Sequence, residues 1–333
     1  MLSKFKFKRT LILFLTLFVL TTVFSGMTLS AENTQATGQL WVLATKADTT
    51  PEQVNNAIKA GANVNVDRGN GVNILMTAVS FNTNPETIKA YLNAGAKDVL
   101  ESKTPYGKTA LMLAARDNSN PDVLKVLIDA GANVNAVDNE NKSALITVVE
   151  QGKNHEMLKI LIDNGADLNI QDKDGKTALY SAARMWQKPE LAKILINAGA
   201  NVNLKNVNGY DALMVAAHYI TDESVINAFV KSGADVNAKT TRGNITALME
   251  AACYTRNPEV VKILLNAGAD VNARNDKEQT VLMLALDKKA DIEIIRALLN
   301  AGADVKAKDK NKRDALYYVK TPQVRELIRS AMK

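Results

Sequence analysis

The sequence predicts an all-α repeat solenoid, because two landmarks alternate along its 333 residues at nearly constant spacing. One landmark is a Leu that follows a small or β-branched residue, and the other is a Gly-Ala pair. The interval from each Leu to the next Gly is 20 residues in all seven cases between Leu75 and Gly302. The reverse interval is 14 residues in six of eight cases and 15 or 16 in the other two. This is the behaviour of a rigid repeat joined to its neighbours by exposed loops of variable length.

Each Leu-to-Gly body predicts two short helices. A residue with a side-chain oxygen precedes the first helix of every body, where it can accept a hydrogen bond from a free N–H group of the first turn. These expected N-caps are Asn73, Thr109, Ser143, Thr177, Asp211, Thr246, Thr280 and Asp314. A Gly ends each second helix, because Gly adopts a left-handed backbone conformation at little cost.

The second helix of each repeat has its own start signal, nine residues after the Leu. Asn or Asp stands there in six repeats, and only Lys188 interrupts the pattern. Four repeats then place Pro at the first helical position, where no N–H group is needed. An acid and a base three residues apart follow, and we expect them to form ion pairs on a solvated outer face.

The stretch after each Gly reads A-N/D-V-N-A and then a polar turn, which predicts a short extended finger. Residues 233–238 (G-A-D-V-N-A), 172–179 (D-K-D-G-K-T-A-L) and 260–265 (V-V-K-I-L-L) together resemble the ankyrin repeat. The resemblance covers about 39–333. It implies helix-turn-helix repeats with a short β-hairpin finger, about nine in number including the terminal caps, and a role in protein binding.

Two departures from that family's pattern recur. The family's T-P-L-H becomes T-A-L-M or T-A-L-Y, so the His that usually ties turns together by hydrogen bonds is lost. We expect apolar packing to substitute for it. The period is 34 residues, not 33, and the extra residue lies between the helices. In the last repeat Pro322 comes only six residues after Leu316, which predicts a shortened first helix.

The composition and motifs of the chain indicate no catalytic, cofactor-binding or metal-binding site. The net charge of +6 includes four basic residues among the first ten, and a chain without them carries only +2, so we expect no nucleic-acid partner. The two histidines lie in different repeats, and no nucleophile-base pair, phosphate loop or metal-ligand cluster is present in the sequence. We therefore expect no enzymatic activity, no cofactor and no metal. The one cysteine, Cys253, is interpreted as a small apolar residue.

The N-terminus predicts export. A basic segment precedes about fifteen apolar residues and a stretch of small residues that ends at Ala31, the pattern of a secretory signal. We assign residues 1–31 to a signal peptide, 32–38 to a polar linker and 39–333 to the repeat domain. The alternative is an uncleaved membrane anchor formed by residues 10–31, which are uncharged and long enough to span a bilayer.

In arrays of this family the finger tips and the exposed side of the first helices form a concave binding face. The matching positions, five and six residues after each Leu and one before each N-cap, differ in type between repeats while the framework is constant. Aromatic and Arg side chains tend to anchor interfaces. Trp186 is expected in the turn between two helices beside this surface. The candidate partner-binding residues are therefore Phe81, Arg116, Arg184, Met185, Trp186, Tyr210, His218, Tyr219 and Tyr254.

The resulting prediction is a secreted or periplasmic scaffold, monomeric, that binds a protein partner through its concave face. The alternative is that the same face binds cell-wall glycan or another ligand.

Overall fold

The computed structural model describes residues 31–152, 155–185 and 187–333. Two compact units divide the chain, one made of residues up to 105 together with 109–132, the other of 106–108 together with 133–333. Nine pairs of α-helices and no β-strand lie within the described residues, which confirms the predicted all-α repeat class.

The first unit contains three helix pairs and one 3-10 turn. They are α2 (Ala31–Ala44) with α3 (Pro51–Lys59), α4 (Ile74–Phe81) with α5 (Pro85–Asn93), and α6 (Ala110–Asp117) with α7 (Pro121–Asp129). The turn, η2 (Ala96–Val99), occupies the one connection that is two residues longer than the usual 14. Ala96 and Leu100 are buried at its two ends, so the inserted residues fold onto the unit.

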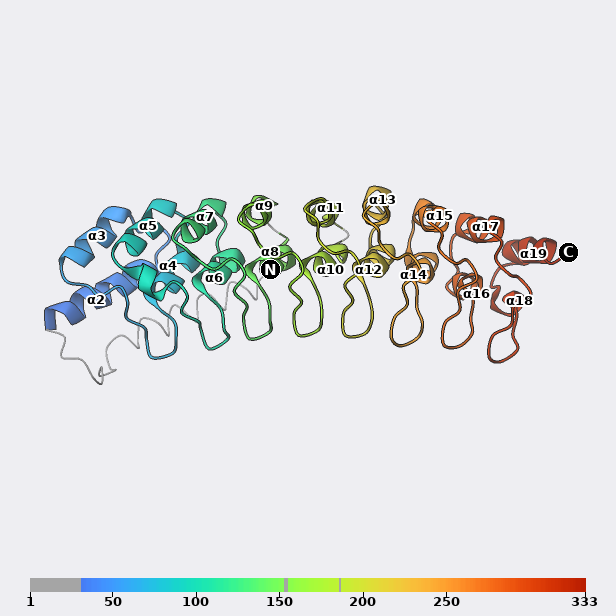
Figure 1. Ribbon diagram of the computed structural model, residues 1–333, viewed down its shortest axis with the longest axis horizontal. Coiled ribbons are helices and arrows are strands. Elements are labelled where there is room, and N and C mark those ends of the chain that lie inside the picture. Colours follow the sequence, from blue (N-terminus) through green and yellow to red (C-terminus); the bar gives the residue numbers. More distant parts are fainter. Residues whose placement is uncertain (1–30, 153–154, 186) are drawn as a thin grey trace. The chain divides into compact units, whose positions relative to one another are not determined.

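The second unit contains six helix pairs, whose first helices form one row and whose second helices form another (Figure 1). The first helices are α8 (Ala144–Gln151), α10 (Ala178–Ala183), α12 (Ala212–Tyr219), α14 (Ala247–Tyr254), α16 (Val281–Asp287) and α18 (Ala315–Tyr318). The second helices are α9 (His155–Asp163), α11 (Pro189–Asn197), α13 (Glu223–Lys231), α15 (Pro258–Asn266), α17 (Ile292–Asn300) and α19 (Pro322–Ala331). The fingers project on the side of the first helices away from the second helices (Figure 1). Helix α18 has only four residues, as the early Pro322 predicts.

The capping pattern read from the sequence is confirmed. All eight expected residues at the first helices accept a hydrogen bond from a backbone N–H of the first turn. At the second helices Lys188 makes no capping bond, as its side chain predicts, and Asn154 lies outside the described residues. The Gly that follows each second helix has positive φ in all eight repeats.

The core consists of the landmark leucines and their neighbours. Seven of the eight leucines are at most 1% exposed, and only Leu316 in the last repeat is half-buried. The positions that hold His in the family are also buried where they are Met or Ile, as in Met214 and Ile146. Apolar packing thus substitutes for that His, as expected.

Asparagines supply the hydrogen bonds between neighbouring repeats. In the loops after four of the second helices, an Asn donates from Nδ2 to the Gly carbonyl of the next repeat and accepts at Oδ1 from a backbone N–H of that repeat. For Asn237 these bonds reach Gly268 at 2.9 Å and Asp270 at 2.8 Å. This asparagine ladder comprises Asn135, Asn203, Asn237 and Asn272.

Two expectations need correction. The expected linker, residues 32–38, lies inside helix α2, where burial of Ala36 and Thr37 stabilises the helix. The fingers contain isolated bridges such as Val137 with Ser143, not hairpin strands. Side chains replace the strand ladder there: Oδ1 of Asp172 accepts hydrogen bonds from the N–H groups of two other residues of its own finger.

The predicted signal peptide, residues 1–31, lies outside the described residues except for Ala31. Within the part of the chain that the structure describes, no helix has the length and apolar character needed to cross a membrane.

Candidate functional site

The candidate residues of the second unit lie where three neighbouring first helices end. Arg184 is the C-terminal cap of α10 and Met185 follows it, His218 and Tyr219 end α12, and Tyr254 ends α14. The two tyrosines are 42% and 46% exposed, among the most exposed large apolar side chains described. The sequence periodicity places these residues at equivalent ends of consecutive helices, so they share one face.

Three rings on this face contact one another, and we call them the aromatic row: Tyr219, His218 and Tyr254. The His218 ring lies 4.3 Å from the Tyr219 ring and stacks on the Tyr254 ring at 4.1 Å between centroids. The row therefore crosses from one repeat to the next. Beyond it, the ammonium of Lys288 lies 5.5 Å from the centroid of Tyr254, within cation-π range.

A buried carboxylate holds the aromatic row in place. Glu250, on α14, is 7% exposed, and its Oε2 lies 2.7 Å from Nδ1 of His218. Because a carboxylate only accepts hydrogen bonds, Nδ1 carries a proton and donates it to this bond. The hydroxyl of Tyr210 donates to Oε1 at 3.3 Å. Burial, and then the charge of Glu250, raise the pKa of Tyr210 to about 12, so this phenol stays protonated at neutral pH.

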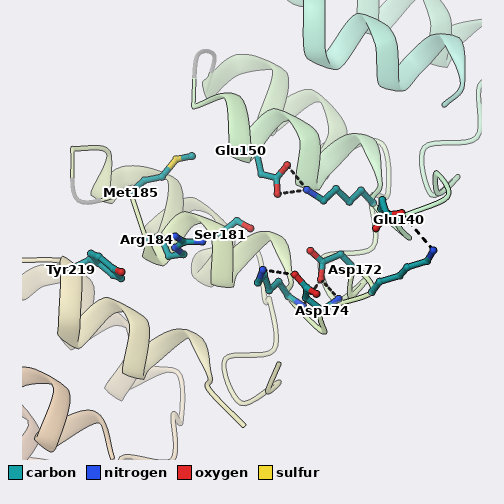
Figure 2. Close-up of a pocket in the computed structure, with 11 residues that line it drawn as sticks. Glu140, Glu150, Asp172, Asp174, Ser181, Arg184, Met185 and Tyr219 are labelled. Carbon is teal, nitrogen blue, oxygen red and sulfur yellow. Dashed lines mark hydrogen bonds and ion pairs between the residues drawn. The ribbon is translucent and has the colours of Figure 1, made fainter. Parts of the chain in front are cut away.

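Beside the aromatic row lies a groove of about 620 Å³ (Figure 2). It is lined by Glu140, Lys142, Glu150, Asp172, Lys173, Asp174, Lys176, Ser181, Arg184, Met185 and Tyr219. Ser181, Arg184 and Met185 come from α10 and its end, Tyr219 comes from the next first helix, and the acids flank them (Figure 2).

Most charges of the groove are already paired. Lys142 contacts Glu150 at 2.7 Å, Lys173 contacts Glu140 at 3.6 Å, and Lys176 contacts Asp174 at 2.6 Å. By contrast, the exposed guanidinium of Arg184 forms no ion pair or hydrogen bond with any described residue. Arg184 is thus the lining cation with unused donors, five N–H groups in a fork that suits carboxylates and carbonyls.

The comparison with known families decides what the chain is. A family model described as ankyrin repeats (3 copies) matches residues 41–138, 118–206, 145–240 and 213–309. These overlapping matches run continuously from 41 to 309 and so cover well over half of the chain. The protein belongs to the ankyrin-repeat family.

Among solved structures, this ankyrin-repeat protein is similar to the ankyrin repeat domain of Bcl-3, described as a unique member of the IkappaB protein family. The similarity has a TM-score of 0.54 at 25% sequence identity and covers 68% of this chain and 97% of that chain. No curated protein matches the chain. Ankyrin repeats are in general scaffolds for protein-protein interaction and not enzymes.

The thiol of Cys253 in this ankyrin-repeat protein has a packing role. Cys253 precedes Tyr254 and is half-buried, and burial, then the charge of Glu250, raise its pKa to about 12. A protonated thiol is a poor nucleophile. Among the described residues, no group of three His, Cys, Asp or Glu side chains is arranged to hold a metal ion.

The other predicted site residues belong to the first unit or lie outside the described residues. Phe81 is half-buried at the end of α4, in the first unit. Arg116, on α6 of that unit, is engaged with the adjacent Asp117 through two hydrogen bonds of 3.0 and 2.7 Å. Trp186 lies outside the described residues.

Sequence reasoning missed Glu250 and two exposed finger-tip residues. The positions equivalent to Glu250 in other repeats hold Thr, Ser, Leu, Val or Tyr, so a lone acid among them was an available signal. Tyr106 and Val207 are 75% and 64% exposed at finger tips. The residue before each N-cap represents the finger in that prediction, whereas Tyr106 and Val207 lie two and three residues before such a residue.

Proposed function

We propose that this protein is an exported ankyrin-repeat scaffold that binds a protein partner through the face formed by Arg184, Met185, Tyr210, His218, Tyr219 and Tyr254. We call this the candidate face. The observation that carries the proposal is the aromatic row, in which two exposed tyrosines are held by a histidine that a buried carboxylate fixes in turn. Nothing in the framework of the repeat requires these residue types at these positions.

Physical chemistry supports recognition by such a row. Interface hot spots are enriched in Tyr, Trp and Arg side chains that are well packed before the partner arrives. A side chain that is already ordered loses less conformational entropy on binding than a mobile one. Tyr219 and Tyr254 meet this condition through their ring contacts, and Arg184 adds free hydrogen-bond donors at the adjoining groove.

Export is supported by the basic and then apolar N-terminal segment. If residues 1–31 are a cleaved signal, the protein isolated from the envelope or medium begins near Glu32. If residues 10–31 are an anchor, the protein keeps its first residues and stays with the membrane. N-terminal sequencing of the natural protein after fractionation distinguishes the two.

The binding test is a cross-linking pull-down from the envelope fraction with residues 32–333 as bait. A variant bait carries Arg184→Ala, Tyr219→Ala and Tyr254→Ala. A matched control carries Lys159→Ala, Lys262→Ala and Arg296→Ala, three exposed side chains on second helices, outside the candidate face and the fingers.

We expect one protein to be enriched by the natural bait and the control, and lost with the variant. Calorimetry with the purified partner should then show an affinity loss of about 2 kcal/mol or more for the variant. Equal capture by all three baits would contradict the assignment of the face. If soluble cell-wall glycan competes with binding, the face recognises sugar, and the protein-partner proposal fails.

A further inference from the structure

The finger of the last repeat carries an unusual concentration of positive charge. Residues 304–313 read D-V-K-A-K-D-K-N-K-R, and the four lysines, Lys306, Lys308, Lys310 and Lys312, are all exposed. The residues between the first three, Ala307 and Asp309, are buried. Alternation along an extended segment thus turns the lysines outward. We call these four residues the lysine finger.

The acid inside this finger does not neutralise the lysines. Asp309 is 1% exposed, and its Oδ2 accepts hydrogen bonds from Nε of Arg313 at 2.8 Å and from the hydroxyl of Tyr318 at 2.6 Å. Burial raises the pKa of the Asp309 carboxyl, but these bonds outweigh burial and hold its pKa well below the usual range. Its negative charge is therefore matched by Arg313. Asp304, at the base of the finger, is exposed and accepts bonds from backbone N–H groups.

Some inner fingers of the second unit differ in this respect, because Lys173 contacts Glu140 and Lys176 contacts Asp174. Other inner fingers hold one or two basic side chains, not four lysines in one segment. None of the four ammonium groups of the lysine finger forms an ion pair with a described acid. The whole segment 304–333 holds nine basic and four acidic side chains, although the chain without its N-terminal basic cluster is nearly neutral. The excess positive charge is thus concentrated at the last repeat.

The lysine finger is joined to the finger before it by a backbone hydrogen bond, in which the N–H of Lys310 donates to the carbonyl of Lys277 at 3.1 Å. Next to the lysine finger stands Tyr317, 60% exposed, with the Arg313 guanidinium 4.6 Å from its ring centroid.

We propose that the lysine finger docks this protein onto a surface of anionic phospholipid. Four unpaired ammonium groups on a projecting loop match a broad sheet of phosphate charge better than one discrete anion. Clustered Lys and Arg bind anionic membranes electrostatically, and Tyr is enriched at the level of the lipid headgroups. The docking does not depend on the candidate face.

The test is sedimentation of residues 32–333 with vesicles of phosphatidylcholine containing phosphatidylglycerol, at low salt. A variant has the four lysines of the finger changed to Gln. A control has Lys89, Lys125, Lys159 and Lys262 changed to Gln, four exposed lysines on second helices that remove the same charge. Circular dichroism and thermal melting check that all three proteins fold.

We expect the natural chain and the control to bind these vesicles and not pure phosphatidylcholine, with the binding lost at high salt because the charges are exposed. The variant should lose about 100-fold or more in partition coefficient. A double substitution in the aromatic row, Tyr219→Ala with Tyr254→Ala, should bind vesicles normally, so the test is independent of the proposed function. Equal binding by variant and natural chain, or lysine-dependent binding to duplex DNA with none to vesicles, would overturn the proposal.

Discussion

Nδ1 of His218 lies 2.7 Å from Oε2 of Glu250, although the two residues are 32 positions apart and end up on first helices of adjacent repeats. The same carboxylate accepts a hydrogen bond from Tyr210, in the finger that precedes α12. One buried acid therefore joins a finger, the helix after it and the next first helix. These hydrogen bonds of Glu250 fix His218, whose ring contacts in turn position the exposed tyrosines of the candidate face.

The first prediction concerns the coupling between His218 and Glu250. His218→Ala should lower the free energy of unfolding by about 1–3 kcal/mol, because it leaves a buried carboxylate short of a partner. Glu250→Gln should also lower the free energy of unfolding. The double variant should be less destabilised than the sum of the two, by about 0.5–3 kcal/mol, since both changes remove one interaction. Urea unfolding measures all four proteins, and strictly additive effects would show that the bond carries no energy.

The second prediction concerns Asp211, the N-cap of α12, which is 3% exposed. Burial raises its pKa from 3.8 to about 6. The folded state thus binds this proton more tightly than the unfolded state does, so protonation of Asp211 stabilises the folded protein. This contribution to the free energy of unfolding is fully present below about pH 4 and is lost as the pH rises through about 6. Asp211→Asn keeps the cap without a charge. It should stabilise the protein by up to about 3 kcal/mol at pH 7 and by almost nothing near pH 4.

A control for that prediction is Asp222, the N-cap of α13. Burial raises the pKa of its carboxyl, but the bonds from Ser224 and the charge of Lys193 outweigh burial, and the pKa is lowered overall. The ionised carboxylate of Asp222 therefore stabilises the folded protein above about pH 4, and this contribution is lost as the pH falls further. Asp222→Asn should therefore destabilise at pH 7. The same sign of effect for both variants in pH-dependent melting would refute this account of the two caps.

The ends of the helices could be predicted because they depend on signals that are local in the sequence. An N-cap, a Pro at the first helical position or a Gly with positive φ depends on a few adjacent residues, so helix ends could be placed from the sequence. The helix over residues 32–38 could not, because its stability comes from burial of Ala36 and Thr37 against other parts of the unit. Its own residues, such as Asn33, Thr34 and Gly38, are weak helix formers.

The candidate site was predicted in outline for a similar reason. The constant repeat spacing identified the ends of the first helices as one face, and so brought His218, Tyr219 and Tyr254 together. Contacts between repeats, such as that of Glu250 with Tyr210, depend on the stacking geometry of side chains, which spacing alone does not give. Likewise, the sequence does not show that the Arg184 guanidinium lacks an ion pair with the described residues. That follows only from the positions of the ion pairs around it.

The third prediction concerns the asparagine ladder. Asn237→Ala removes two hydrogen bonds to the next repeat and should lower the free energy of unfolding by about 1–2 kcal/mol. Asn164→Ala is the matched control, since its side-chain amide donates to Ile160 within its own repeat. If chemical unfolding shows the same loss for both variants, the ladder does not couple the repeats.

The last prediction compares two glycines whose φ angles are nearly identical. Gly209 has φ of +79° and Gly233 has φ of +80°, so Ala meets a similar strain from positive φ at both, about 1–2 kcal/mol. Their surroundings differ. A Cβ at Gly233 meets nothing within 4 Å, whereas a Cβ at Gly209 would collide with the backbone N of Thr241 in the next finger.

Gly209→Ala should therefore cost about 1–3 kcal/mol more than Gly233→Ala, because backbone cannot move aside as a side chain can. The excess measures how tightly neighbouring fingers stack, since the Thr241 N–H donates to the carbonyl of Asn208 at 3.1 Å. Thermal and urea unfolding of the two variants give this difference directly. Equal losses would mean that the fingers separate easily, and the exposed finger tips would then be poor parts of any rigid binding surface.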